Sequence, residues 1–436
     1  MKTINNVTVI GANGTMGRNI SAIFAAFGNA NVYMVSRSIE KSEEAKEKAI
    51  KSVRAESIGA KLIPADYSAL EECICKSDLV IECVAENWEI KCDVHNKISV
   101  FCKDDTIICT GTSGLSVTGI SELYPENIRK NIIGMHFFNP PYNMSLCELI
   151  PTEYTDIALL DFVKEYCDKT IYRTSVIIKD MPAFLGNRIG FQFINEALQY
   201  AEKYSANGGI DYIDALLGSF TGRAMPPLVT SDFVGLDVHK AIVDNLYENT
   251  NDYAHETFVM PEFAVELINE GKLGRKTGEG LYKTIKTEDG KKLRCVYDIE
   301  RKEYREVVKY SLPFIDKMVE CLVNGDYELA YNILKDDSSA ESKICLEFIL
   351  KYIVYSLYAS MLLGGSTESA DDVMVTGFNW CAPLGMIEVL GGKEEFVALC
   401  KKNLDGEILI GADFDNLVST IKDSKYDFRR YIRAHK

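Results

Sequence analysis

Residues 7–17 read VTVIGANGTMG, and this stretch decides the class of fold. Residues 7–10 are a short β-branched run, which predicts a buried strand. Gly11, Gly14 and Gly17 follow at regular spacing, and residues 16–27 have the pattern of a helix. A glycine loop between a strand and a helix is typical of dinucleotide binding, because glycine lets the backbone approach a pyrophosphate and the helix N-terminus supplies free N–H groups.

The loop is one residue longer than the usual dinucleotide pattern. Its spacing is G-x-x-G-x-x-G in place of G-x-G-x-x-G, and the extra residue, Asn13, tolerates left-handed backbone better than most residues. A plain tight turn would also explain the glycines, but their place after the first strand favours a cofactor loop. The expected cofactor contacts here are Gly11, Asn13, Gly14, Thr15, Met16 and Gly17.

The rest of the first 180 residues alternates apolar runs with helical patterns. Strand-like runs recur at residues 32–35, 79–84, 107–110, 132–137, 146–150 and 174–178, and helical patterns stand at 43–56 and 156–168. Strands that alternate with helices predict a parallel sheet covered on both faces. We therefore expect an α/β fold whose first domain, residues 1–181, is a Rossmann-type doubly wound sheet.

After Pro182 the pattern changes to helices. Residues 184–203 repeat apolar side chains at spacings of three and four, whereas the polar segment 284–300 suits a linker or an exposed hairpin. Two stretches echo each other and indicate two related units. They are IDYIDALLGSFTGRAMPPL at 210–228 and SADDVMVTGFNWCAPL at 369–384. We expect two all-α helical domains, at residues 182–283 and 284–436.

The composition limits the partners and the location of the chain. It has 48 Lys and Arg against 64 Asp and Glu, a net charge of −16, so nucleic acid and anionic membrane surfaces are not expected partners. The most apolar stretch, residues 352–365, is too short for a bilayer and predicts a buried helix. The 13 scattered cysteines form no C-x-x-C or metal-ligand spacing, and the first residues show no secretory signal. We expect reduced thiols, no metal and a cytoplasmic location.

The end of the second predicted strand bears on the choice of cofactor. An Asp or Glu there would hydrogen-bond the ribose 2′-hydroxyl of NAD. The strand ends in Ser36, Arg37 and Ser38, without a carboxylate. Two hydroxyls and a guanidinium suit the 2′-phosphate of NADP instead. The pattern favours NADP, and NAD stays open if Arg37 is only a solvated surface cation.

Residues 134–141 read GMHFFNPP and place His136 at the end of a strand. Glu148 follows twelve residues later on the next strand-like run, so two adjacent strands would bring the pair into hydrogen-bonding range. A carboxylate fixes one imidazole tautomer and raises its basicity, which leaves the other nitrogen to move a proton. A purely structural His–Glu pair is the alternative.

This segment resembles the L-3-hydroxyacyl-CoA dehydrogenase family, and other motifs agree in order over about the first 283 residues. They are VIGxxGTMG at 9–17, DLVIECVAENWEIK at 78–91, TSGLSV at 112–117, HFFNPP at 136–141, CELIP at 147–151, AFLGNRIG at 183–190, DFVGLD at 232–237 and LGRKTGEGLYK at 273–283. The remainder resembles the duplicated helical domain of the family's longer members, without their enoyl-CoA hydratase domain.

The resemblance implies roles for the residues that match these motifs. His136 would transfer a proton, and Glu148 would orient His136. Ser113 would lie between substrate and cofactor, and Asn187 would lie near the thioester. Further matches are cofactor contacts at Glu86, Lys91, Asn139 and Lys276, and substrate contacts at Ser52, Ser113 and Asn187.

The implied function is an oxidoreductase that interconverts 3-hydroxyacyl-CoA and 3-oxoacyl-CoA with a nicotinamide cofactor, in fatty acid or butanoate metabolism. The partners would be an acyl-CoA substrate and a separate enoyl-CoA hydratase. The second helical domain suggests a monomer by internal pseudo-dimer, with a homodimer as the alternative.

Two other functions stay open. One is a dehydrogenase of a free hydroxy acid in the same family, because the segment 36–79 is shorter than the family's usual CoA-binding helical tail. Gly59 also stands where a lysine is expected, with Lys61 as a stand-in. The other is a catalytically silent cofactor-binding assembly protein.

Overall fold

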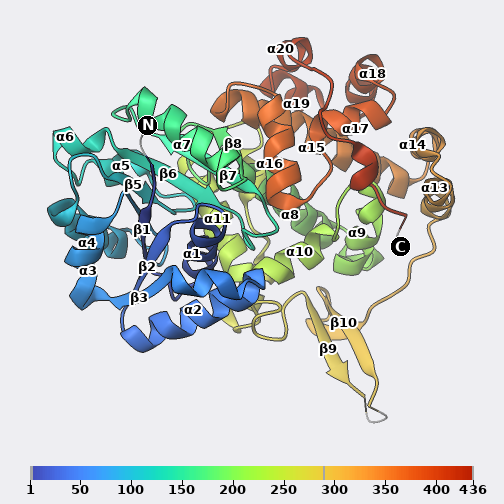
Figure 1. Ribbon diagram of the computed structural model, residues 1–436. Helices are drawn as coiled ribbons and strands as arrows, with labels where there is room; N and C mark the ends of the chain where they lie inside the picture. The colour runs from blue at the N-terminus through green and yellow to red at the C-terminus, as the bar shows by residue number, and fades with distance from the viewer. Residues whose placement is uncertain (1–2, 288–289, 435–436) are drawn as a thin grey trace. The chain divides into compact units, whose positions relative to one another are not determined.

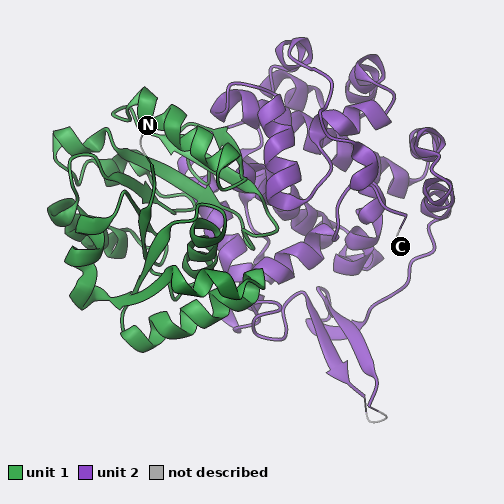
Figure 2. Cartoon of the chain, viewed as in Figure 1, with its two compact units in different colours: residues 1–184 green, residues 185–436 purple. Residues whose placement is uncertain are grey.

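The computed structural model describes residues 3–287 and 290–434, and the chain forms two compact units, residues 1–184 and 185–436 (Figure 2). The first unit ends three residues beyond the predicted boundary at 181, so both predicted helical domains, apart from residues 182–184, lie within the second unit. Residues 1–2, 288–289 and 435–436 of the predicted domains lie outside the described residues. A division of the second unit at residue 283 stays a prediction.

The first unit is built on one eight-stranded sheet (Figure 1). Its strands are β1 (Asn6–Ile10), β2 (Asn31–Ser36), β3 (Leu62–Asp66), β4 (Leu79–Glu82), β5 (Ile107–Thr110), β6 (Ile132–Phe137), β7 (Leu146–Pro151) and β8 (Thr174–Ile177). Their order is β3-β2-β1-β4-β5-β6-β7-β8. β1 to β6 are parallel, and β7 is antiparallel to β6. The strand order reverses at β1, the point where doubly wound sheets bind ligands.

Helices cover both faces of this sheet, as the alternating sequence pattern predicts. They are α1 (Thr15–Ala26), α2 (Ile39–Val53), α3 (Leu70–Lys76), α4 (Trp88–Phe101), α5 (Val117–Ser121), α6 (Glu126–Arg129) and α7 (Ile157–Lys169). Successive residues of a strand point to opposite faces, so Val9 packs in a core with α1, α2 and α7 while Ile10 packs in a core with α3 and α4. Both faces of the strands are therefore apolar, which confirms the doubly wound sheet.

The second unit is mainly helical. Its helices are α8 (Gly186–Lys203), α9 (Ile210–Leu216), α10 (Pro227–Val234), α11 (Leu236–Asn249), α12 (Glu262–Asn269), α13 (Pro313–Val323), α14 (Tyr327–Asp336), α15 (Ala340–Leu363), α16 (Glu368–Phe378), α17 (Pro383–Val389), α18 (Lys393–Asn403), α19 (Gly406–Gly411) and α20 (Phe414–Ser419). α8 packs against both α15 and α16, which joins the two predicted helical domains into one body.

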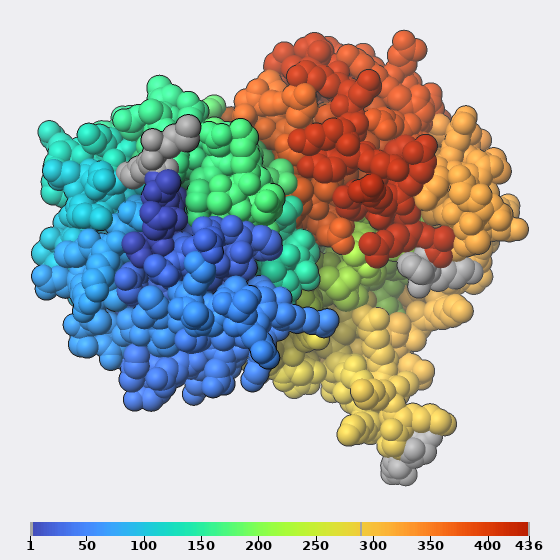
Figure 3. Space-filling view, in the orientation of Figure 1, coloured from blue at the N-terminus to red at the C-terminus, as the bar shows by residue number. Residues whose placement is uncertain are grey.

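A small sheet makes the all-α description of this part incomplete. β9 (Tyr282–Lys286), β10 (Lys292–Asp298) and β11 (Glu303–Glu306) form a three-stranded antiparallel sheet, so the hairpin expected at 284–300 is present. The β9–β10 hairpin, in yellow, stands out from the helices of its unit (Figure 3). Its sequence is rich in lysine, and most of the β9 side chains are exposed, so it carries little of the apolar alternation that predicts strands.

α15 is longer than the apolar stretch 352–365 that predicts it. Its 24 residues are long and apolar enough to cross a membrane by length and composition, but 72% of the apolar window is buried inside the structure. Lys351 interrupts the apolar run in the sequence, yet its ammonium lies 2.7 Å from Glu196 of α8 and 2.6 Å from Glu347. The buried fraction and this charge pairing fit a core helix.

The two echoing stretches of sequence adopt matching local structure. Asp214 accepts a hydrogen bond from the backbone N–H of Leu228 at 2.8 Å, and Asp371 accepts one from that of Leu384 at 2.9 Å. Arg223, at the corresponding place in the first stretch, pairs with Trp380 of the second in an antiparallel bridge. The echo therefore reflects a repeated helix–loop–helix arrangement.

Candidate active site

The loop between β1 and α1 is shaped to admit a pyrophosphate. Gly11 has a φ of 84°, and a Cβ there would lie 2.5 Å from the carbonyl oxygen of Cys83. Gly14 is the N-cap of α1, no side chain caps this helix, and its first turn has no acidic residue. The N–H groups of the first turn are therefore open to an anion. This cradle without side chains fits the nicotinamide dinucleotide that the sequence predicts.

The remaining residues of the loop differ from expectation in one respect. Asn13 and Thr15 are exposed and Met16 is half-buried, as suits residues beside a ligand. Asn13 does not take the left-handed backbone that its tolerance suggested, because the positive φ falls on Gly11. The sharp turn out of β1 is thus made by glycine, and the extra residue follows it.

The end of β2 corrects part of the cofactor prediction. Ser36 is 1% exposed, and its hydroxyl lies 3.0 Å from the carbonyl oxygen of Ser38 and 2.5 Å from the hydroxyl of Ser42. The Ser42 hydroxyl in turn donates to the carbonyl oxygen of Ala65. The Ser36 hydroxyl is therefore directed into the protein and is not available to a 2′-phosphate. Arg37 is exposed and has no carboxylate within 4.0 Å in the described part of the chain.

The predicted hydrogen bond between His136 and Glu148 is present. β6 and β7 place the two residues directly opposite each other, and His136 Nδ1 lies 2.7 Å from Glu148 Oε2. His136 is 5% exposed and Glu148 is fully buried. Because the carboxylate accepts at Nδ1, the neutral imidazole keeps its lone pair on Nε2. The rings of Phe138 and Phe184 pack on the imidazole at centroid distances of 4.6 and 5.4 Å.

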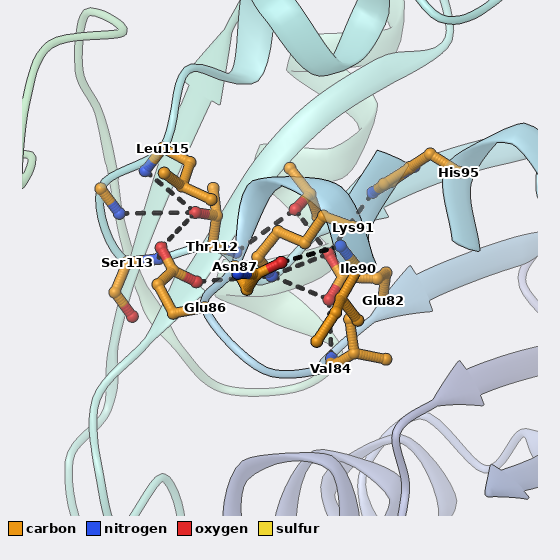
Figure 4. Close-up of polar contacts among 12 residues, drawn as sticks. Glu82, Val84, Glu86, Asn87, Ile90, Lys91, His95, Thr112, Ser113 and Leu115 are labelled. Carbon is orange, nitrogen blue, oxygen red and sulfur yellow. Dashed lines mark hydrogen bonds and ion pairs between the residues drawn. The ribbon is translucent and has the colours of Figure 1, made fainter. Parts of the chain in front are cut away.

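Ser113 lies on a loop that Glu86 holds (Figure 4). The loop follows β5, and Glu86 Oε1 accepts from the hydroxyl of Thr112 at 2.5 Å and from the backbone N–H of Ser113 at 2.9 Å. The hydroxyl of Ser113 makes no hydrogen bond with the residues that the structure describes, so it can serve a ligand. Two predicted site residues, Ser113 and Glu86, are thus brought together.

The predicted direct contact of Lys91 with the cofactor needs correction. Lys91 is 0% exposed, and its ammonium lies 2.8 and 3.0 Å from the two oxygens of Glu82 and 3.4 Å from Glu86. Its three N–H groups are therefore directed to carboxylates of the protein. An amphipathic helix leaves such a lysine on the surface unless a buried partner exists, and Glu82 at the end of β4 is that partner.

The buried pair is ionised. Burial alone would raise the pKa of Glu82, but a hydrogen bond from His95 and the charge of Lys91 outweigh it and bring that pKa to about 2. Burial would lower the pKa of Lys91, but the charges of Glu82 and Glu86 raise it above its usual value. Opposite charges within 3 Å and good hydrogen bonds are what make buried charges tolerable.

Sequence reasoning missed several residues around Ser113. Glu82 lies inside the motif at residues 78–91, and a carboxylate in an apolar strand is itself a signal of a buried partner. The other missed residues are His95, Thr110, Thr112 and Asp180, whose roles depend on contacts between elements distant in sequence.

The other predicted site residues are more dispersed. The hydroxyl of Ser52, on α2, donates to the carbonyl oxygen of Ala49, and Asn139 is exposed after β6. Asn187 and Lys276 belong to the second unit, where Asn187 lies in the first turn of α8 and Lys276 forms an ion pair with Asp237. The roles predicted for Asn187 near the thioester and for Lys276 at the cofactor stay predictions.

The first unit offers groups for proton transfer and a loop shaped for a dinucleotide. His136 offers one open imidazole nitrogen, and Ser113 offers a hydroxyl. Across residues 3–287 and 290–434 the structure holds no group of three or more His, Cys, Asp or Glu residues suited to a metal ion.

Comparisons with known proteins give the family. Residues 6–181 match the model of the 3-hydroxyacyl-CoA dehydrogenase NAD binding domain, and residues 184–284 match that of the 3-hydroxyacyl-CoA dehydrogenase C-terminal domain. A probable 3-hydroxyacyl-CoA dehydrogenase of Caenorhabditis elegans is 33% identical over 305 residues, which are 65% of this chain and 94% of the relative.

Longer relatives and a solved structure extend the likeness. A probable 3-hydroxyacyl-CoA dehydrogenase of Bacillus subtilis is 25% identical over 421 residues, 90% of this chain, and the chain spans about half the length of this relative, 52%. The crystal structure of 3-hydroxybutyryl-CoA dehydrogenase from Escherichia coli K12 has the same fold over 96% of this chain and 100% of its own, with a TM-score of 0.70 at 20% identity. The chain therefore belongs to the 3-hydroxyacyl-CoA dehydrogenase family.

Proposed function

We propose that the chain interconverts 3-hydroxyacyl-CoA and 3-oxoacyl-CoA with a nicotinamide cofactor. The observation that carries this proposal is the buried His136–Glu148 pair, with Nε2 open, in a unit that matches an NAD binding domain. The names of the family's members support the acyl-CoA substrate. The nicotinamide, when bound, accepts a hydride from C3 of the hydroxyacyl group or returns it to the 3-oxo group.

His136 performs the proton transfer of this reaction. Nε2 takes the proton of the 3-hydroxyl group in oxidation and returns it to the 3-oxo oxygen in reduction. Glu148 holds the tautomer with the proton on Nδ1 and stabilises the imidazolium that forms. The rings of Phe138 and Phe184 shield the imidazole from water, and the Ser113 hydroxyl hydrogen-bonds the substrate oxygen.

We further propose NADP as the preferred cofactor. The support is the absence of a carboxylate among the residues that end β2, together with the exposed guanidinium of Arg37. Since Ser36 is turned inward and the Ser38 side chain is hydrogen-bonded to Glu40, Arg37 is the main group for the recognition of a 2′-phosphate. Such a site is weaker than one with two hydroxyls, so the expected preference is moderate.

The partners and the assembly are also proposals. The repeated helical arrangement of the second unit supports a monomer in which one repeat covers the other, and a separate hydratase partner is proposed from the family resemblance alone. All 13 cysteines are free, which supports a reducing cytoplasmic location.

A free hydroxy acid is the second candidate substrate. Only residues 54–61 connect α2 to β3, and they form little more than one 3₁₀ turn, Glu56–Ala60. This connection supplies no long segment to hold the nucleotide end of CoA, and the hydroxyl of Ser52 is engaged by Ala49.

One assay separates these proposals. Reduction of acetoacetyl-CoA and of acetoacetate is followed at the nicotinamide absorbance with NADH and with NADPH, for the wild type, His136→Ala and the control His255→Gln. The proposed function requires turnover of acetoacetyl-CoA that His136→Ala abolishes and His255→Gln keeps. Turnover of acetoacetate alone favours the second candidate. Cofactor binding without any turnover contradicts both and favours a silent assembly protein.

A further inference from the structure

We infer that Glu82 is a positioning residue of the site, which holds the Ser113 loop through Lys91 and Glu86. The inference rests on the proposed function, since it gives Ser113 its importance. It goes beyond the family resemblance, which assigns Glu86 and Lys91 to the cofactor and assigns nothing to Glu82. Figure 4 shows the chain of contacts from His95 on one side to Ser113 on the other.

Glu82 is the fixed end of this chain. It is 0% exposed, and its Oε1 accepts from the backbone N–H of Val84 at 2.6 Å and from Lys91 at 2.8 Å. Oε2 accepts from Lys91 at 3.0 Å and from the hydroxyl of Thr110 at 2.9 Å, and His95 Nε2 lies 3.4 Å away. A buried carboxylate with this many partners has one orientation only, because any rotation leaves a buried donor unpaired.

His95 and Tyr124 support Glu82 from the far side. His95 is 0% exposed, and its Nδ1 lies 2.6 Å from the hydroxyl of the buried Tyr124. The two rings meet edge to face, at a centroid distance of 5.8 Å. This aromatic pair closes the network on the side away from the loop and so restricts the movement of Glu82.

Lys91 transmits the position of Glu82 to Glu86. Its ammonium contacts both oxygens of Glu82 and lies 3.4 Å from Glu86 Oε2. Glu86 is 41% exposed at its side chain, so solvent alone would leave it several rotamers. With Oε2 toward Lys91, the other oxygen faces Thr112 and the N–H of Ser113.

Other contacts hold the loop near α5 and within its turn, and Glu86 adds the contact at the backbone N–H of Ser113. Asp180 accepts from the backbone N–H groups of Val117 and Thr118 and from the hydroxyl of Ser116, which fixes the start of α5. The Thr112 hydroxyl accepts from the N–H of Leu115 and donates to Glu86, which makes a tight turn. The position of Ser113 therefore depends on Glu86, and through it on Glu82.

The test is Glu82→Gln, which keeps the shape and removes the charge. The matched control is Asp168→Asn, because Asp168 likewise accepts from a lysine, at 2.6 Å, and from a backbone N–H, that of Ser175, at 2.9 Å. The readouts are kcat and KM on acetoacetyl-CoA, the cofactor Kd by fluorescence, and hydrogen exchange of the peptide 111–118.

The expected result is a loss confined to positioning. In Glu82→Gln, kcat falls about 10- to 100-fold, the magnitude that a misplacement of about 1 Å produces, while the cofactor Kd changes less than about 3-fold. The peptide 111–118 exchanges faster, and Asp168→Asn changes neither quantity. A folded Glu82→Gln with kcat within about 2-fold of wild type overturns the inference. Lost activity with unchanged exchange overturns it too.

A second variant covers the case in which Glu82→Gln does not fold. Glu82→Gln combined with Lys91→Met removes both charges, so that neither is left unpaired in the interior. The same faster exchange of residues 111–118 is expected, and exchange equal to wild type contradicts the inference. Hydrogen exchange does not depend on turnover, so an inactive wild-type protein refutes the proposed function and still leaves the link from Glu82 to the loop open to test.

Discussion

Replacement of Glu148 by glutamine tests the proton transfer proposed for His136. The substitution keeps the volume of a side chain that is 0% exposed, and it removes the negative charge 2.7 Å from His136 Nδ1. Glutamine can still accept from Nδ1 through its amide oxygen, so the imidazole keeps its place. The imidazolium that forms during oxidation loses its counter-charge.

The magnitude follows from the burial of the pair. Two unit charges about 4 Å apart interact by about 4 kcal/mol at an effective dielectric constant of about 20, which sets an upper limit. A hydrogen bond to a charged group contributes about 1.5–3 kcal/mol, and the residual bond to glutamine keeps part of it. At about 1.4 kcal/mol per factor of ten, kcat for oxidation of 3-hydroxybutyryl-CoA falls about 10- to 150-fold.

The assay compares kcat, KM and the cofactor Kd of wild type, Glu148→Gln and the control Glu165→Gln. Glu165 is an exposed carboxylate of the same unit, paired with Lys169 at 2.8 Å, and its replacement should leave all three quantities unchanged. We expect the loss in kcat, with KM and Kd within about 3-fold of wild type. A folded Glu148→Gln enzyme with kcat within about 2-fold of wild type would refute the proposed role of the pair.

Substitutions at four further positions test other parts of the structure. Gly11→Ala should raise the cofactor Kd at least about 10-fold in a fluorescence titration, because its φ is 84° and the added Cβ meets a backbone oxygen at 2.5 Å. Arg37→Asp should lower kcat/KM with NADPH about 10-fold and leave NADH equal or better; equal losses with both would remove the 2′-phosphate argument. Arg223→Ala should lower the free energy of unfolding, measured in urea, by about 2–4 kcal/mol. The reason is that the buried guanidinium lies 3.7 Å from the ring centroid of Phe193 and 4.7 Å from that of Trp380. Arg223→Met should lower the free energy of unfolding by less. Burial outweighs the hydrogen bonds to Asp371 and raises the pKa of its carboxyl group to about 7. The contribution of this carboxyl group to the free energy of unfolding is therefore complete below pH 3.8 and is lost as the pH rises to about 7. Asp371→Asn should match wild type in stability near pH 4 and be more stable, by up to about 4 kcal/mol, at pH 8.

The sequence carries the local features of the first unit almost completely. A β-branched run, a turn that needs positive φ and an uncapped helix start are properties of neighbouring residues, so Gly11 and its loop could be read directly. The pairing of His136 with Glu148 was also accessible, because an antiparallel connection between consecutive strands leaves few possible registers.

The direction and partners of individual side chains were not accessible in the same way. Ser36 lies at the end of a strand in the sequence, but its hydroxyl turns inward because it meets the hydroxyl of Ser42 on α2, which in turn donates to the carbonyl oxygen of Ala65 on β3. Lys91 has the appearance of a surface cation on α4, and it is buried because Glu82 ends the neighbouring strand. Both outcomes depend on contacts between elements that only the folded chain brings together.

The sequence by itself determined the doubly wound sheet, the glycine loop and the family, because each depends on periodicity or on motifs that are contiguous in the chain. The tertiary structure alone decided which polar groups are buried and with whom, as in the network from His95 through Glu82 and Lys91 to the Ser113 loop. A buried charge is stable only when several partners surround it at once, and those partners come from β4, β5 and α4, which local sequence patterns do not relate to one another.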